Sequence, residues 1–131
     1  MLKQITVKDY MASNVITLSP EMGISEAVKI FLSHRISGAP VVKESGELMG
    51  LLSEKDCIKV IHDATYHEAM DGKVSDYMST EVKTVSSHMG IVEVSELFIS
   101  HSYRRFPVVE GDKVIGQISR RDVLKALDKN W

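Results

Sequence analysis

The segment GLLSEKD at residues 50–56 returns at residues 116–122 as GQISRRD. Each copy leads from a glycine through a strand-like pair of residues into Ser-x-x-Asp. A serine at the N-cap and an acidic residue three positions later form a capping box, so both segments predict the end of a strand and the start of a helix. The repetition of this motif raises the question of how much of the chain is duplicated.

The residues before this device are repeated as well. VKDYMASNVITLSPEMGISEAVKIFLSHRISGAPVV (7–42) aligns without a gap to VSDYMSTEVKTVSSHMGIVEVSELFISHSYRRFPVV (74–109), and seventeen of these 36 positions are identical. Two copies are too few for a solenoid, so the duplication predicts two similar halves about a pseudo-two-fold axis. The predicted division is a first repeat at residues 1–61, a linker at 62–73 and a second repeat at 74–131.

Apolar periodicity predicts the elements of each repeat. We expect short strands at 15–17 and 82–84, and amphipathic helices beginning at Ile24 and Ile91. A hairpin follows, whose first strand starts with Pro-Val-Val at 40–42 and 107–109, where proline at a strand's first residue is tolerated. A closing helix follows each Ser-x-x-Asp. Each repeat is therefore predicted as β-α-β-β-α, an α/β fold in which helices cover small sheets.

Composition narrows the class of protein. The chain has 131 residues, 44% hydrophobic and 26% charged, which are ordinary globular values. Its net charge of -2 gives no electrostatic reason to expect a nucleic acid as partner. No run approaches 18 apolar residues, so no membrane association is expected. The single cysteine, Cys57, cannot form an internal disulfide, which favours a reducing compartment and predicts a cytoplasmic protein.

The duplicated pattern resembles the CBS domain, named after cystathionine β-synthase, and specifically the tandem CBS pair. The resemblance rests on runs ending in A-P-V-V and F-P-V-V, a turn containing glycine, and G-x-x-S-x-x-D opening the last helix. It covers essentially residues 7–127 and suggests a stand-alone CBS-domain protein. It implies a regulatory sensor that binds AMP, ADP or ATP, with S-adenosylmethionine and NAD as further candidates, and that signals to a partner protein.

The resemblance also implies two ligand clefts, each drawing residues from both repeats. In this sequence one cleft would combine Ser119, Asp122 and Arg105 with Ile16, Ile36 and Ser37. The other would combine Ser53 and Asp56 with Lys83, Tyr103 and Arg104. The aspartates are the expected ribose ligands, and the serines are expected near a phosphate. The family also tends to form homodimers, so a homodimer is expected.

Two interpretations of Ser-x-x-Asp remain open on the residues alone. It is a capping box, or it offers a carboxylate to ribose hydroxyls at a helix N-terminus that favours phosphate, and both roles are compatible. The second repeat carries Arg104, Arg105, Arg120 and Arg121, where the first carries Ser37, Gly38, Glu54 and Lys55. These arginines form either a solvated basic face or phosphate contacts. If they bind phosphate, the two clefts differ in affinity.

No constellation supports an enzyme. The sequence has no catalytic triad pattern and no glycine-rich phosphate loop, so we expect binding without catalysis and no required cofactor, with an adenine nucleotide as the regulatory ligand. His62, His67 and Glu68 match no strong zinc spacing, so no metal site is expected. The competing hypothesis is a structural or oligomerisation module that binds no ligand.

Overall fold

The computed structural model describes residues 2–67 and 72–131 and divides into two compact units. Unit 1 comprises Met1–Val15 and Lys83–Trp131, and unit 2 comprises Ile16–Val82. The packing boundaries therefore differ from the repeat boundaries in the sequence. Each unit joins the body of one repeat to the leading segment of the other, so the two repeats exchange their first residues.

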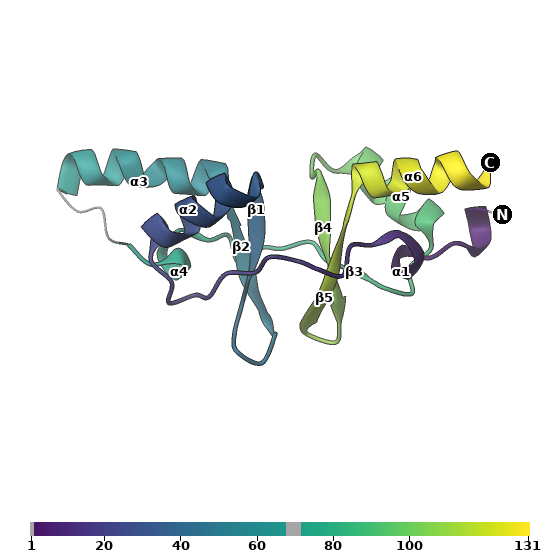
Figure 1. Ribbon diagram of the computed structural model, residues 1–131, viewed down its shortest axis with the longest axis horizontal. Coiled ribbons are helices and arrows are strands. Elements are labelled where there is room, and N and C mark those ends of the chain that lie inside the picture. Colours follow the sequence, from purple (N-terminus) through teal and green to yellow (C-terminus); the bar gives the residue numbers. More distant parts are fainter. Residues whose placement is uncertain (1, 68–71) are drawn as a thin grey trace. The chain divides into compact units, whose positions relative to one another are not determined.

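Unit 2 is a β-hairpin packed against helices (Figure 1). Its elements are α2 (Ile24–His34), β1 (Gly38–Val42), β2 (Leu48–Ser53), α3 (Glu54–His67) and α4 (Val74–Tyr77). Strands β1 and β2 are antiparallel, with Gly38 opposite Ser53. Of the periodic apolar residues of α2, Ile24, Ala27 and Phe31 belong to the buried core, as an amphipathic helix predicts, whereas Leu32 is 74% exposed.

Unit 1 repeats this plan with one more strand. Its elements are η1 (Leu2–Gln4), α1 (Val7–Tyr10), β3 (Val85–Ser86), α5 (Ile91–Ser100), β4 (Arg105–Glu110), β5 (Lys113–Ser119) and α6 (Arg120–Asn130). The sheet order is β3-β4-β5, with β3 parallel and β5 antiparallel to β4. The mixed α/β architecture confirms the predicted fold class.

The predicted first strands were placed too early. Val85–Ser86 forms β3 instead of residues 82–84, and the first repeat has only a bridge from Leu18 to Val41 instead of a strand at 15–17. Leu18 and Val85 are the buried residues of these segments, and their burial against the Pro-Val-Val strands fixes where pairing begins. Helix α3 also runs to His67, six residues into the predicted linker.

The exchanged segments are bonded to the hairpin of the unit that they join. Ala12 and Gln117 exchange two backbone hydrogen bonds of 2.9 Å in unit 1. Ser79 and Leu51 exchange two of 2.8 and 2.9 Å in unit 2. A tyrosine from each short helix adds a side-chain bond to the closing helix. The Tyr77 hydroxyl donates to Asp63 Oδ2 at 2.8 Å, and this bond, more than burial, raises the pKa of Tyr77.

Within residues 2–67 and 72–131, none of the helices has both the length and the apolar character needed to span a bilayer.

Candidate ligand-binding site

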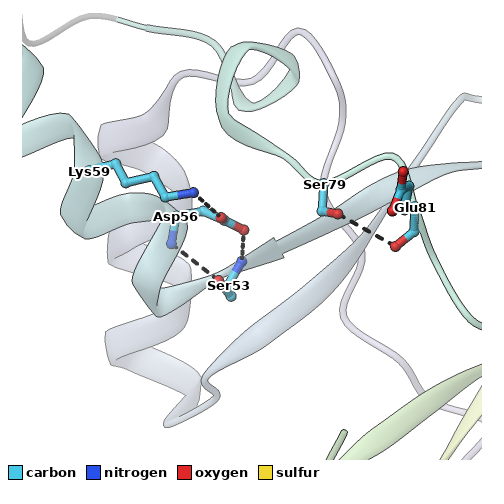
Figure 2. Close-up of polar contacts among 5 residues, drawn as sticks. All are labelled: Ser53, Asp56, Lys59, Ser79 and Glu81. Carbon is cyan, nitrogen blue, oxygen red and sulfur yellow. Dashed lines mark hydrogen bonds and ion pairs between the residues drawn. The ribbon is translucent and has the colours of Figure 1, made fainter. Parts of the chain in front are cut away.

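In unit 2, Ser53 and Asp56 close a capping box where β2 passes into α3. The backbone N–H of Ser53 donates to Asp56 Oδ2 at 2.9 Å, and the backbone N–H of Asp56 donates to Ser53 Oγ at 3.1 Å. Lys59, one turn later, places its Nζ 3.4 Å from Asp56 Oδ1 (Figure 2). The Asp56 carboxylate is thereby held at the first turn of the helix, where the helix dipole favours negative charge.

In unit 1, Ser119 and Asp122 form the same box at the start of α6. The backbone N–H of Ser119 donates to Asp122 Oδ2 at 2.9 Å, and the Ser119 hydroxyl lies 3.0 Å from that oxygen. The backbone N–H of Asp122 lies 3.2 Å from Ser119 Oγ. The capping interpretation is therefore confirmed for both copies. A carboxylate accepts about four hydrogen bonds, so capping leaves room for a ligand contact.

Two further aspartates make the same bond without belonging to the predicted sites. Asp9 Oδ2 accepts from the backbone N–H of Thr6, and Asp76 Oδ2 accepts from that of Lys73, both at 2.9 Å. Neither helix start was predicted from the sequence, although Thr6-x-x-Asp9 and Lys73-x-x-Asp76 occupy matched positions of the two repeats. An aspartate at this position therefore does not by itself identify a ligand site, and Asp9 and Asp76 serve as internal controls.

The loop before β1 lies against the start of α3. The carbonyl of Ser37 accepts the backbone N–H of Glu54 at 2.9 Å, and Gly38 pairs with Ser53 in the hairpin. Ser37, Ser53 and Asp56 are thus brought together at one end of unit 2. The half-buried Ile36 immediately precedes them in the chain. The predicted residue Ile16 belongs to the same unit, as its first residue.

The equivalent loop in unit 1 also lies against the start of its closing helix. The backbone N–H of Arg120 donates to the carbonyl of Arg104, and Arg120 Nε donates to the carbonyl of Tyr103, both at 3.1 Å. The Tyr103 ring lies between two aromatic neighbours, with centroids 6.0 Å from His101 and 5.7 Å from Phe106. Two backbone carbonyls thus position the loop, and the pattern of side chains in the sequence did not indicate these bonds.

Charge distinguishes the two helix starts. Around Ser119 and Asp122 the chain places Arg104, Arg105, Arg120 and Arg121, and Arg105 pairs directly with Ser119 in the sheet. Around Ser53 and Asp56 the equivalent positions are Ser37, Gly38, Glu54 and Lys55. Guanidinium groups bind phosphate in a bidentate manner, so the start of α6 is chemically the better anion site.

The predicted site residues fall into one set per unit. Unit 2 holds Ile16, Ile36, Ser37, Ser53 and Asp56, and unit 1 holds Lys83, Tyr103, Arg104, Arg105, Ser119 and Asp122. The structure brings together Ser37 with Ser53 and Asp56, and the Tyr103–Arg105 loop with Ser119 and α6. The two clefts, each combining residues of both sets, stay a prediction.

Possible metal ligands and the thiol of Cys57 give no support for a second kind of site in the part of the chain that the structure describes. Among residues 2–67 and 72–131, no three His, Cys, Asp or Glu side chains gather as metal ligands would. Glu68, named above with His62 and His67, lies outside the described residues. Cys57 is half-buried on α3, and desolvation, followed by the nearby charges of Asp56 and Glu54, raises the pKa of its thiol. A raised pKa keeps the thiol protonated at neutral pH, which suits a small packing side chain.

Comparison with known proteins identifies the duplicated unit. The sequence model described as "CBS domain" matches residues 7–63 and again residues 74–129. The chain belongs to the CBS domain family. Both matches contain a Ser-x-x-Asp helix start, so the Ser53–Asp56 box and the Ser119–Asp122 box each belong to a CBS domain.

Relatives of this CBS pair differ in length. CBS domain-containing protein YhcV of Bacillus subtilis is 34% identical over 120 residues, which cover 90% of this chain and 82% of that protein. The uncharacterized protein MJ1225 of Methanocaldococcus jannaschii is 30% identical over 125 residues. That match covers 95% of this chain but only 44% of MJ1225, so the chain spans less than half of that relative.

Solved structures share the fold of the whole chain. The crystal structure of CBSX2 in complex with AMP has a TM-score of 0.84 at 23% identity, covering 95% of this chain and 97% of that one. CBSX2 is a CBS-pair protein from Arabidopsis thaliana. The CBS domain pair of MJ0100, in complex with 5′-methylthioadenosine and S-adenosyl-L-methionine, has a TM-score of 0.77 at 24% identity, with 96% and 98% covered. At these identities the likeness establishes the fold.

Proposed function

We propose that this CBS pair is a regulatory sensor module that binds an adenosine-containing ligand and signals its occupancy to a partner protein. AMP, ADP and ATP are the first candidates, and S-adenosylmethionine and NAD follow. Structures of the same fold hold AMP in one case and two adenosine-containing sulfur compounds in another, which supports this ligand class. The alternative is a structural or oligomerisation module without a ligand.

The observation that carries the proposal is the start of α6. There an ordered aspartate, a helix N-terminus and an arginine-bearing loop held by two hydrogen bonds converge within one unit. An ionised carboxylate accepts hydrogen bonds from both hydroxyls of a ribose. Helix N–H groups and guanidinium groups attract phosphate. The three components match the sugar and phosphate of a nucleotide.

Each ligand is proposed to contact both repeats. One cleft would combine Ser119, Asp122 and Arg105 with Ile16, Ile36 and Ser37, and the other Ser53 and Asp56 with Lys83, Tyr103 and Arg104. The support is the family resemblance, which implies ligand contacts at these positions. The proposed role is regulation without catalysis, in a cytoplasmic homodimer. A ligand produces such regulation only by binding one arrangement of the protein more tightly than another.

A thermal-shift screen with AMP, ADP, ATP, NAD and S-adenosylmethionine separates the sensor from the scaffold. A ligand present at one hundred times its dissociation constant stabilises the native state by about 2.7 kcal/mol. We expect at least one adenosine compound to raise the melting temperature. No shift with any of them would favour the scaffold.

The aspartates provide the mutational test, with a control in the same unit. Asp122→Ala and Asp9→Ala each remove a cap bond of 2.9 Å, so each should lower the free energy of unfolding by about 1 kcal/mol. Only Asp122→Ala should also abolish or weaken ligand binding, because only Asp122 lies in the proposed site. Calorimetric titration with the ligand found by the screen measures the difference.

The same comparison applies in unit 2, where Asp56→Ala is paired with Asp76→Ala. If the ligand binds an aspartate variant and its control equally well, that aspartate acts only as a cap and the site assignment is wrong. Matched losses of stability within each pair show that the binding difference does not come from unfolding.

A further inference from the structure

The two exchanged segments are held by the same backbone bonds. We name residues 5–12, which lie in unit 1, strap 1, and residues 72–79, which lie in unit 2, strap 2. Three bonds of each strap match in kind and length: Val7 N–H to Met89 O and Val74 N–H to Met22 O at 2.8 Å, Lys8 N–H to Ser87 O and Ser75 N–H to Pro20 O at 3.0 Å, and Ile91 N–H to Ile5 O at 2.8 Å and Ile24 N–H to Gly72 O at 2.9 Å. Val7 and Val74 are both fully buried. A difference in how the straps are held must therefore come from their other side chains.

Strap 2 is held in addition by two bonds to carboxylates. Lys73 Nζ lies 2.8 Å from Glu21 Oε2, and the Tyr77 hydroxyl donates to Asp63 Oδ2 at 2.8 Å. The bond to Glu21 is also the main reason that the pKa of Lys73 is raised. Glu21 lies just before α2 and Asp63 lies on α3, so the two bonds tie strap 2 to both of these helices.

Strap 1 has no charged bond at either of the matched positions. Thr6 and His88 occupy the places of the lysine and the glutamate, and they cannot form an ion pair with each other. The Tyr10 hydroxyl accepts a hydrogen bond of 2.9 Å from Asn130 Nδ2, so its partner is a neutral amide instead of a carboxylate. The same backbone frame is thus completed by neutral groups in unit 1 and by charged groups in unit 2.

Gly72 makes room for the tyrosine of strap 2. A Cβ added to Gly72 would lie 2.6 Å from Cε2 of Tyr77, so the ring packs directly against the backbone of the strap. The matched residue of strap 1 is Ile5, whose side chain packs against the apolar core of unit 1. Strap 2 therefore lacks this apolar contact and instead holds a ring whose hydroxyl reaches Asp63.

We infer that strap 2 is a charge-dependent latch, held closed by the carboxylates of Glu21 and Asp63, and that strap 1 closes without such charges. Charge-assisted hydrogen bonds are about twice as strong as neutral ones. Because the backbone bonds of the two straps are the same, loss of these charges opens strap 2 while strap 1 stays closed. The duplicated fold thereby contains one segment that responds to charge and a matched segment that does not.

The latch adjoins the candidate site of unit 2. Figure 2 shows Ser79, the last residue of strap 2, beside the strand that ends at Ser53, and Ser79 exchanges two backbone hydrogen bonds with Leu51 of that strand. Asp63 follows Asp56 by seven residues, which is two helical turns, so both carboxylates lie on one side of α3. The side chains of the latch are therefore positioning groups for this helix start. That step rests on the proposed function, whereas the latch itself does not.

Amide hydrogen exchange on the full chain measures the opening of each strap, with the other strap as internal control. Asp63→Asn keeps the shape of the side chain but removes its charge. It should lower the protection of the Val74 and Ser79 amides about fivefold, the difference between a charged and a neutral bond. The Val7 and Ala12 amides should keep their protection. Thermal unfolding confirms that the variant is folded.

Salt provides a measurement on the wild-type protein. Raising the ionic strength should lower the protection of the Val74 amide about twofold and leave the Val7 amide unchanged, because salt screens an exposed ion pair. The double variant Thr6→Lys with His88→Glu places the ion pair in strap 1 and should make the Val7 amide sensitive to salt as well. Lys43→Met removes an exposed ion pair in the turn between β1 and β2, and as the control it should alter neither strap.

The positioning role is measured at the two capping boxes. The N–H groups of Ser53 and Ser119 donate to Asp56 and Asp122 in the same way, both at 2.9 Å. Asp63→Asn should lower the protection of the Ser53 amide and leave that of Ser119 unchanged. Unchanged protection at Ser53 would contradict the positioning role.

Gly72→Ala tests the latch without touching a charged group. The added Cβ displaces the Tyr77 ring, so this variant should open strap 2 as Asp63→Asn does. The latch is wrong if folded Asp63→Asn keeps the wild-type protection of the Val74 amide, or if the substitution or salt lowers protection equally in both straps. None of these measurements uses a ligand. Failure of the latch therefore leaves the proposed function standing, and absence of a thermal shift with AMP leaves the latch standing.

Discussion

At the scale of single residues, the glycine that begins each G-x-x-S-x-x-D motif has a specific steric role. A Cβ added to Gly116 would lie 2.6 Å from the carbonyl oxygen of Ala12 and 3.0 Å from Met11 Sδ. A Cβ added to Gly50 would lie 2.6 Å from the carbonyl oxygen of Ser79 and 2.8 Å from Met78 Sδ. The glycines therefore admit the exchanged segment to the hairpin, and the matched methionines pack against them.

Gly116→Ala should destabilise unit 1 by about 1–3 kcal/mol, because a backbone carbonyl cannot move aside as a flexible side chain can. It should also weaken the pair of hydrogen bonds between Ala12 and Gln117. Chemical denaturation measures the loss. Gly23→Ala is the control, since nothing lies within 4 Å of its added Cβ. Equal effects of the two substitutions would mean that close approach is not the reason for glycine at position 116.

At the scale of elements, the two four-residue helices determine how the repeats are assembled. Val7 of α1 is fully buried in the core of unit 1, and Val74 of α4 is fully buried in the core of unit 2. Each residue belongs to one repeat in the sequence but completes the core of the other. A defect in either helix is therefore expected to act on the repeat that does not contain it.

Val7→Ala should destabilise the second repeat, and Val74→Ala the first. Each removes two buried methyl carbons and leaves a cavity, which costs about 2 kcal/mol. Amide hydrogen exchange on the full-length chain locates the effect, because local opening lowers protection only in the unit concerned. Val7→Ala should accelerate exchange in β4 and β5, and Val74→Ala in β1 and β2. The reverse pattern, or equal acceleration in both hairpins, would contradict the exchange of segments.

The sequence predicted the elements that carry apolar periodicity or a Ser-x-x-Asp cap. Helices α2 and α5 begin at Ile24 and Ile91 as expected, and both Ser-x-x-Asp boxes form. It did not predict α1 and α4, because four residues are too few to show a helical period. Nor did it predict the exchange of segments, since an apolar pattern shows that a valine is buried but not which core receives it.

The candidate site, like the fold, was predicted from the sequence only in part. Residue types and spacing located the capping aspartates and the arginines, because both follow from local chemistry. The anchoring of the Tyr103–Arg104 loop to Arg120 depends on backbone carbonyls, which every residue possesses and no pattern distinguishes. The combination of residues from both units depends on long-range placement, and it stays a prediction.

At the scale of the whole molecule, charge is distributed unevenly between two otherwise equivalent halves. The net charge is only -2, yet α6 begins with Arg120 and Arg121 where α3 begins with Glu54 and Lys55. A ligand rich in phosphate will therefore experience different electrostatic fields at the two helix starts. Duplication supplied two helix starts with the same Ser-x-x-Asp cap, and substitution at the first positions of the helices made them unequal in charge.

Calorimetric titration with ATP should accordingly resolve two sites of different affinity. Arg121→Ala should weaken the tighter site by about tenfold, the scale of one charge-assisted hydrogen bond, and leave the other site nearly unchanged. Lys55→Ala, at the equivalent position of α3, is the matched control and should affect only the weaker site. Its effect should be smaller, because an ammonium group lacks the bidentate geometry of guanidinium.

Added salt should narrow the difference in affinity between the two sites, since it screens exposed charges. Two equal and independent sites, unaffected by Arg121→Ala, would show that the arginines form a solvated basic face.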